Sequence, residues 1–186
     1  MGDPRRNVEL KAIDPDPGRS LAACRALEAE DRGNLWQRDS YFKVVHGGLK
    51  LRRENPGGAH LIQFERADEP QQRESRYRIV KVEDSQTLLD ALTAALGLAV
   101  VVTKRRRLFL WRGVRIHLDA VEQLGTFIEL EAVAPPDSDL AHEHSLIAAL
   151  RETFDITDDR LVASGYARQL TAALAANSMH AASPPG

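Results

Sequence analysis

The stretch Arg115-Ile116-His117-Leu118-Asp119, continued after Gly125 by Ile128-Glu129-Leu130-Glu131, decides the fold of this chain. Successive side chains of a strand point to opposite faces, so the polar residues of each run share one face and the aliphatic residues share the other. A turn over 123–125 folds the two runs into an antiparallel hairpin. This hairpin gathers four carboxylates, those of Asp119, Glu122, Glu129 and Glu131. Like charges destabilise a sheet when they face each other, so the hairpin predicts a cation among them, either a divalent ion or basic side chains. Taken alone, it also fits a sheet face in contact with water.

Composition limits the class of protein. The chain has 186 residues, 43% of them hydrophobic, which suits one globular domain over 1–174 with a flexible tail over 175–186. The single cysteine, Cys24, excludes an internal disulfide and a cysteine-based zinc site, and we expect it to be a buried structural thiol. The net charge of −2 gives no global case for binding nucleic acid or a membrane. The N-terminus lacks a signal-peptide pattern, and the apolar stretch 94–102 is too short to cross a bilayer, so we expect a cytoplasmic protein.

Hydrophobic periodicity predicts the elements. Period-two alternation favours strands at 7–13, 35–45, 49–54, 60–67, 75–82 and 99–111, before the hairpin described above. Helical spacing favours helices at 18–31, 84–96, 137–154 and 166–174. The second of these helices has a predicted buried stripe of Leu88, Leu89, Leu92, Ala95 and Leu96, and the third has one of Leu140, Ile147, Leu150 and Phe154. The sequence therefore predicts one antiparallel, mostly β domain with helices packed outside, in the α+β class.

Charged residues alternate with aliphatic ones in almost every predicted strand. They are Glu9 and Lys11, Lys50 and Arg52, Arg66, Lys104 and Arg106, Arg115 with His117 and Asp119, and Glu129 with Glu131. On an ordinary two-layer domain this face meets water. If the sheet closes into a barrel beneath helices, the same face turns inward, where charges need partners. A chain of phosphates with a bound metal ion supplies partners for charges of both signs. Arginine and lysine suit phosphate oxygens. The carboxylates of Glu9, Asp119, Glu129 and Glu131 favour a hard cation such as Mg²⁺ or Mn²⁺.

Several short motifs together resemble one known family. Asn7-Val8-Glu9-Leu10-Lys11 resembles the ExExK signature of the CYTH superfamily, the triphosphate tunnel metalloenzymes. Further matches follow in the family's order: Leu49-Lys50-Leu51-Arg52, Phe64-Glu65-Arg66, Val102 to Arg107, Arg115 to Glu122, and Glu129-Leu130-Glu131. Two of these segments, Lys104 to Arg107 and Arg115 to Glu122, are most similar to the class IV adenylate cyclase-like branch. The resemblance implies a closed eight-stranded antiparallel β-barrel.

The resemblance also implies roles for individual residues. Glu9, Asp119, Glu129 and Glu131 would hold the metal, and Lys11, Lys50, Arg52, Arg66, Lys104, Arg106 and Arg115 would bind the triphosphate. Lys11, Arg52 and Glu129 would be the catalytic residues, with Glu122 in support and His117 as a hydrogen-bonded barrel histidine. One departure stands out, because Asn7 replaces the first glutamate of ExExK and so puts a second metal site in doubt.

Three functions fit these residues. The first is an adenylate cyclase that converts ATP to cyclic AMP and pyrophosphate, which the branch resemblance favours slightly. The second is a triphosphatase acting on tripolyphosphate, thiamine triphosphate or a nucleoside triphosphate, and the third is a binding module without catalysis. The run Arg105-Arg106-Arg107 alternates between strand faces, which disfavours a nucleic-acid patch. We expect a nucleotide or other triphosphate as partner, no nucleic acid or membrane, and, from the resemblance alone, a homodimer.

Overall fold

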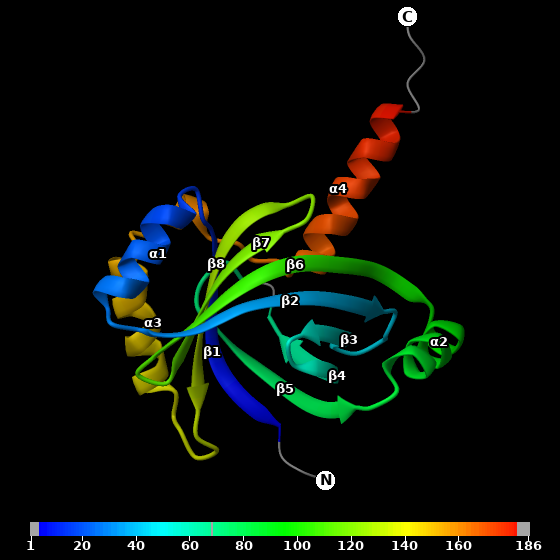
Figure 1. Ribbon diagram of the computed structural model, residues 1–186, viewed down its shortest axis with the longest axis horizontal. Coiled ribbons are helices and arrows are strands. Elements are labelled where there is room, and N and C mark those ends of the chain that lie inside the picture. The colour runs from blue at the N-terminus through cyan, green and yellow to red at the C-terminus, as the bar shows by residue number, and fades with distance from the viewer. Residues whose placement is uncertain (1–3, 68, 182–186) are drawn as a thin grey trace, which may run out of the picture.

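The computed structural model describes residues 4–67 and 69–181 of the chain and shows a closed antiparallel barrel of eight strands (Figure 1). The barrel order is β1-β5-β4-β3-β2-β6-β7-β8, with β8 returning to β1. The strands are β1 (Arg5–Ile13), β2 (Glu30–Phe42), β3 (Gly48–Asn55), β4 (Gly58–Arg66), β5 (Arg73–Val82), β6 (Leu98–Trp111), β7 (Val114–Val121) and β8 (Gly125–Ala134). The predicted fold class is therefore confirmed.

The hairpin of β7 and β8 forms as predicted, with Arg115 paired to Glu131 and His117 paired to Glu129. Gln123 and Gly125 have φ values of 65° and 98°, which lets the chain reverse within a short turn. The prediction that Glu122 lies with the other carboxylates of the hairpin is wrong. Because β7 ends at Val121, the alternation stops there, and Glu122 lies exposed in the turn instead of beside the other carboxylates.

The main hydrophobic core lies outside the barrel, under two helices, α1 (Pro17–Ala26) and α3 (Ala141–Thr153). The aliphatic face of β1, β7 and β8 packs there against side chains of both helices and the segment after α3; its members include Val8, Leu10, Ile116, Ile128, Leu130, Cys24, Ile147, Leu150 and Phe154. The predicted burial of Cys24 and of the α3 stripe is confirmed. Because the aliphatic faces point outward, the alternating charged faces point into the barrel.

Three helix boundaries differ from the sequence prediction. Helix α1 ends at Ala26, since Glu28 has a φ of 52° and β2 begins at Glu30. Helix α3 begins at Ala141 because Leu140, with a φ of 69°, interrupts the expected helix from 137. Helix α4 (Tyr166–Ala181) continues past Leu174 and extends away from the barrel (Figure 1). The single domain and the flexible tail stay predictions, and 182–186 lie outside the described residues.

Helix α2 (Ser85–Leu96) has the predicted ends, with the Asp84 side chain accepting a hydrogen bond from the Thr87 amide and Gly97 at the C-terminus. Its predicted buried stripe is wrong, because none of its residues is fully buried. The helix lies at the opposite end of the molecule from α1 and α3 and rests mainly on β2 and β3, so it covers little of the barrel (Figure 1). A short 3₁₀ turn, η1 (Asp158–Arg160), precedes α4. Within the described part of the chain, no helix has the length and apolar character needed to span a membrane.

Candidate functional site

The inward faces of the strands line a cavity that opens to solvent. Seven cationic side chains line it against three carboxylates, and two more carboxylates, Asp39 and Asp119, lie behind four of these cations. The cations are Lys11, Lys50, Arg52, Arg66, Lys104, Arg106 and Arg115, and the carboxylates are Glu9, Glu129 and Glu131. All seven residues predicted to bind triphosphate therefore face one space, although their role stays a prediction. Asp119, the fourth predicted metal ligand, lies behind them and is 3% exposed.

One pair of cations, on β3, is held by an aspartate of β2. Arg52 donates from Nε and Nη2 to the two carboxylate oxygens of Asp39, both at 2.7 Å. Lys50 donates to Asp39 Oδ2 at 3.0 Å, and its ammonium lies 5.4 Å from the centre of the Tyr41 ring. Asp39 is 1% exposed. This aspartate fixes the direction in which both cations enter the cavity.

The same arrangement recurs on β6 and β7. Arg106 donates from Nε and Nη2 to Asp119, both at 2.6 Å, and Lys104 donates to Asp119 Oδ2 at 3.2 Å. Arg106 also donates to Glu129 Oε2 at 2.7 Å. Each Lys-x-Arg strand segment is thus matched by one aspartate on the neighbouring strand, directly opposite the arginine in register. Asp119 acts here as the anchor of two cations.

Glu9 is likewise engaged by cations. Arg66 Nη1 donates to its Oε1 at 2.9 Å, and Arg73 Nε donates to the same oxygen at 3.1 Å. Arg73 also donates to the backbone carbonyls of Glu69 and Ala163, so it ties β5 to the segment before α4. In contrast, the Oδ1 of Asn7, the residue that departs from the family signature, is buried with no hydrogen-bond partner among the described residues.

Tyr166, the first residue of α4, lies against the cavity and is 4% exposed. Its hydroxyl donates to Asp119 Oδ2 at 2.9 Å, while Lys11 Nζ lies 3.7 Å from the ring centre and Lys104 Nζ lies 4.9 Å from it. The preceding segment is fixed by a hydrogen bond from the Val162 amide to the Lys11 carbonyl. Tyr166 therefore positions two lysines and one aspartate by cation–π contact and hydrogen bonding.

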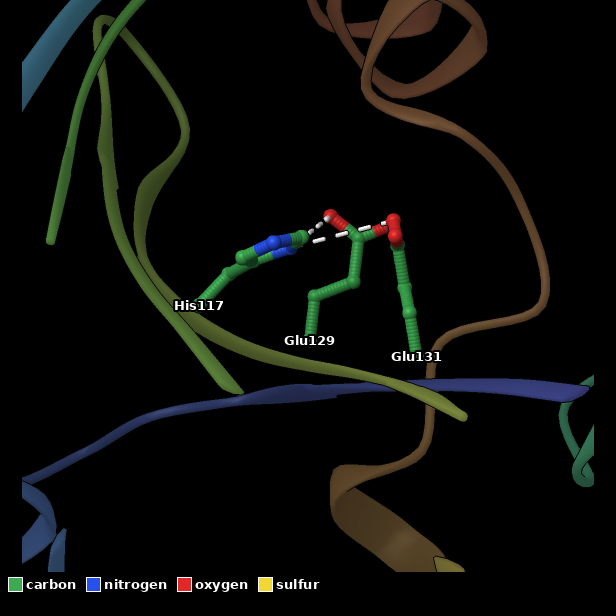
Figure 2. A group of neighbouring side chains, drawn as sticks. All are labelled: His117, Glu129 and Glu131. Carbon is green, nitrogen blue, oxygen red and sulfur yellow. Dashed lines mark ion pairs between the residues drawn. The ribbon is translucent and has the colours of Figure 1, made fainter. Parts of the chain in front are cut away.

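The residues that could hold a metal meet on β7 and β8. The side chains of His117, Glu129 and Glu131 converge, with one potential ligand atom from each lying within 4.8 Å of the others (Figure 2). Lys11 Nζ is 3.5 Å from Glu129 Oε1, and Arg115 Nη1 is 3.6 Å from Glu131 Oε2. The Nδ1 atom of His117 is buried and has no hydrogen-bond partner among the described residues. Two carboxylates beside an unpartnered nitrogen fit a divalent cation.

Burial sets the protonation of the cavity. Desolvation lowers the pKa values of Lys11 and Lys50, and desolvation together with Arg106 lowers the pKa of Lys104 to about 7. Desolvation alone would raise the pKa of Glu129, but Lys11 and other neighbours hold it well below its usual value. Lys104 is therefore the lysine of the cavity whose charge changes near neutral pH.

Asp39, Arg73 and Tyr166 are among the residues of this site that sequence reasoning missed. Asp39 has the same period-two position as Gln37 and Tyr41 on a predicted strand, so the alternation could have identified it. Arg73 fell in a predicted loop because β5 begins two residues earlier than its apolar pattern indicates. Tyr166 looked like an ordinary residue of a helix face, and nothing local in the sequence places it in the barrel.

The fold and the site together define a closed antiparallel barrel with a basic interior cavity. The CYTH domain family matches residues 5–158, and the chain belongs to this family. Members of the family are generally enzymes and in general depend on a metal. No curated protein sequence matches the chain.

Solved structures share the fold. The PH1012 protein from Pyrococcus horikoshii superposes with a TM-score of 0.79 at 20% identity, covering 87% of this chain and 98% of that one. A protein from Vibrio parahaemolyticus, provisionally named an adenylate cyclase, gives 0.75 at 19% identity over 92% and 99% of the two chains. A provisional adenylyl cyclase from Hippeastrum, described as having a dominant triphosphatase activity, gives 0.56 at 14% identity over 87% and 91%. At these identities the likeness concerns the fold alone.

Proposed function

We propose that this protein is a divalent-metal-dependent enzyme that acts on a triphosphate-bearing substrate, and that it is an adenylate cyclase of the class IV type. The observation that carries the proposal is the single cavity into which seven cations point from β1, β3, β4, β6 and β7. A triphosphate carries several negative charges, and these seven cations offer partners for its oxygens from five strands. An extended anion that contacts several strands at once fits this arrangement better than a compact one.

The cations have complementary tasks in this proposal. Arg52 and Arg106 use Nε and Nη2 on their aspartates, so among the described residues each keeps its Nη1 for a phosphate oxygen. Lys11, between Tyr166 and Glu129, is placed to neutralise charge that develops on a phosphate oxygen next to the carboxylates. In the cyclase reaction the ribose 3′-hydroxyl attacks the α-phosphorus, and the basic cluster stabilises the leaving pyrophosphate.

A metal ion would be held by Glu129 and Glu131 beside this cluster. When bound, it would lower the pKa of the attacking hydroxyl or water and polarise a phosphoryl oxygen. Glu129 receives Arg106 at 2.7 Å and Lys11 at 3.5 Å, so the chain holds this carboxylate deprotonated and fixed before substrate enters. This position links the phosphate-binding cations to the metal-binding carboxylates.

A triphosphatase is the second candidate, and the Hippeastrum neighbour with its dominant triphosphatase activity favours it. It would use the same cavity, with water as the nucleophile at a terminal phosphorus. Two strands contribute apolar side chains to the cavity wall, among them Ile62, Phe64 and Ile79, and these would contact an organic group in either reaction.

The deciding experiment incubates the purified protein with ATP, thiamine triphosphate and tripolyphosphate, each with Mg²⁺ or Mn²⁺. Formation of cyclic AMP and pyrophosphate from ATP supports the cyclase, whereas release of phosphate from tripolyphosphate without cyclic AMP overturns it in favour of the triphosphatase. A Glu129→Gln variant should lose turnover by at least about 100-fold and still bind tripolyphosphate. If the wild type binds tripolyphosphate and turns over none of the three substrates, the protein is a binding module and the enzyme proposal fails.

A further inference from the structure

The unpartnered nitrogen of His117 has a defined place in the site. His117 extends from β7 into the barrel and is 3% exposed. Its Nδ1 lies 3.9 Å from Glu129 Oε2 and 3.8 Å from Glu131 Oε1 (Figure 2). Both separations are too long for hydrogen bonds, and Nδ1 has no other partner among the described residues. A buried polar atom without a partner is unfavourable, so the arrangement indicates a ligand between the three side chains.

The spacing suits one ion. A divalent transition metal lies about 2.1 Å from nitrogen and carboxylate oxygen, so it joins ligand atoms that are up to about 4.2 Å apart. The two Nδ1–oxygen distances are within this limit, and the full set spans 4.8 Å, which rotation of one flexible glutamate side chain can reduce.

Glu9 and Asp119, the other two predicted metal ligands, are less available than Glu131. Glu9 accepts hydrogen bonds from Arg66 and Arg73, and Asp119 accepts them from three side chains, Lys104, Arg106 and Tyr166. In contrast, the closest cation to Glu131 is Arg115, at 3.6 Å. An ion would therefore meet less competition from basic side chains at Glu131 than at Glu9 or Asp119.

We propose that His117 Nδ1, Glu129 and Glu131 bind one divalent ion as a set of one nitrogen and two carboxylates, and that this set prefers Mn²⁺ or Co²⁺ over Mg²⁺. Imidazole is a ligand of transition ions, whereas Mg²⁺ takes oxygen ligands almost entirely. The inference rests on the proposed function only in taking the family's metal to bind in this cavity. It departs from the all-oxygen set that the sequence predicts, because it places a nitrogen in the coordination sphere.

The test measures metal binding to the full chain without substrate. Mn²⁺ is titrated and followed by electron paramagnetic resonance, its affinity is compared with that of Mg²⁺ by competition, and electron spin echo modulation detects a coordinated ¹⁴N nucleus. We expect saturable Mn²⁺ binding with a ¹⁴N coupling in the wild type. The His117→Asn variant, whose side-chain oxygen lies near the place of Nδ1, should lose the coupling and weaken Mn²⁺ binding at least about tenfold, narrowing the preference over Mg²⁺.

His144→Asn on α3, outside the barrel, is the matched control and should bind Mn²⁺ like the wild type. Wild-type Mn²⁺ spectra without a ¹⁴N coupling, or the absence of saturable Mn²⁺ binding, overturn the proposal, and neither result depends on whether the His117 variant folds. Because substrate is absent, a protein that coordinates Mn²⁺ through nitrogen and turns over no triphosphate would refute the proposed function and leave this inference intact.

Discussion

Two buried aspartates organise the cations of the cavity at the residue scale. Asp39 and Asp119 each receive both edge nitrogens of an arginine and the ammonium of a lysine two residues before it. Removing one member of a buried ion pair leaves an uncompensated charge, which is far more costly than losing an exposed pair. The two aspartates therefore stabilise the cavity, because without them its neighbouring cations would repel one another.

Replacing Asp39 with asparagine should lower the free energy of unfolding by about 3 kcal/mol, because Lys50 and Arg52 stay buried without their counter-charge. Urea unfolding followed by circular dichroism measures the change. Asp31→Asn is the matched control, since Asp31 pairs with Arg107 at the surface, and should alter stability by less than about 1 kcal/mol. Equal unfolding midpoints for the two variants would contradict the structural role of Asp39.

Lys104 should make anion binding depend on pH. Its pKa is lowered to about 7 in the free protein by burial and by Arg106, and a bound anion favours the ammonium and raises that pKa. The complex then holds more protons than the free protein above pH 7, so affinity falls as pH rises through this range. Calorimetry without metal measures the affinity for tripolyphosphate at pH 6.5 and at pH 8.5. The fold decrease in affinity between these pH values should be about ten times larger for the wild type than for Lys104→Arg. Because arginine stays charged, identical pH dependence in both proteins would exclude Lys104 as the titrating group.

At the scale of elements, the helices differ in how much they hold the fold together. Helix α3 buries Ile147 and Leu150 completely against the outer face of the barrel, whereas α2 has no fully buried residue. Hydrophobic stabilisation follows the apolar area removed from water, so α3 contributes to the core and α2 covers part of the surface. The same periodicity predicted a buried stripe in both helices.

An alanine comparison tests this difference. Ile147→Ala should lower the free energy of unfolding by about 2–5 kcal/mol, since it leaves a cavity in a fully buried cluster. Leu92→Ala on α2 removes a half-buried side chain and should cost less than half as much. Thermal or urea unfolding of the two variants provides the measurement, and a larger loss of stability for Leu92→Ala would contradict the greater contribution of α3 to the core.

At the scale of the whole molecule, closure of the barrel makes the charged interior unavoidable. All eight strands pair on both sides, so the barrel has no free strand edge. One face of each strand must then point into the barrel, and here it is the charged face. Seven cations line the cavity, and a polyanion would add negative charge to this basic space. Ligand binding and folding stability should therefore be linked.

Tripolyphosphate should stabilise the protein even without metal. At about 100 times its dissociation constant, a ligand adds about 2.7 kcal/mol, which corresponds to a rise in Tm of roughly 5–10 °C for a chain of this size. Scanning fluorimetry in the presence of a chelator measures the shift. Lys50→Met, inside the cavity, should reduce it, and Lys81→Met, on an exposed position of β5, should not. A shift that is the same for both variants would place the anion outside the cavity.

Local patterns made most of the fold predictable. Each strand's alternation is a property of a few adjacent residues, so it fixed which side chains share a face, including all seven cations of the cavity. The caps of α2 were predictable for the same reason, because Asp84 and Gly97 act on their own turn. Helix boundaries set by a positive φ at Glu28 and Leu140 were not predictable, since a positive φ is uncommon in residues other than glycine.

The sequence by itself therefore determined the strand faces, the hairpin of Arg115 to Glu131 and the family of the chain. Only the tertiary structure decided which charges meet. It paired Asp39 with Lys50 and Arg52, brought Tyr166 from the C-terminal helix onto Lys11, and placed His117 beside Glu129 and Glu131 with its nitrogen unpartnered. The physical reason is separation along the chain. The alternation of side chains is set by adjacent residues of one strand, whereas ion pairs in a closed barrel join residues from strands far apart in the chain.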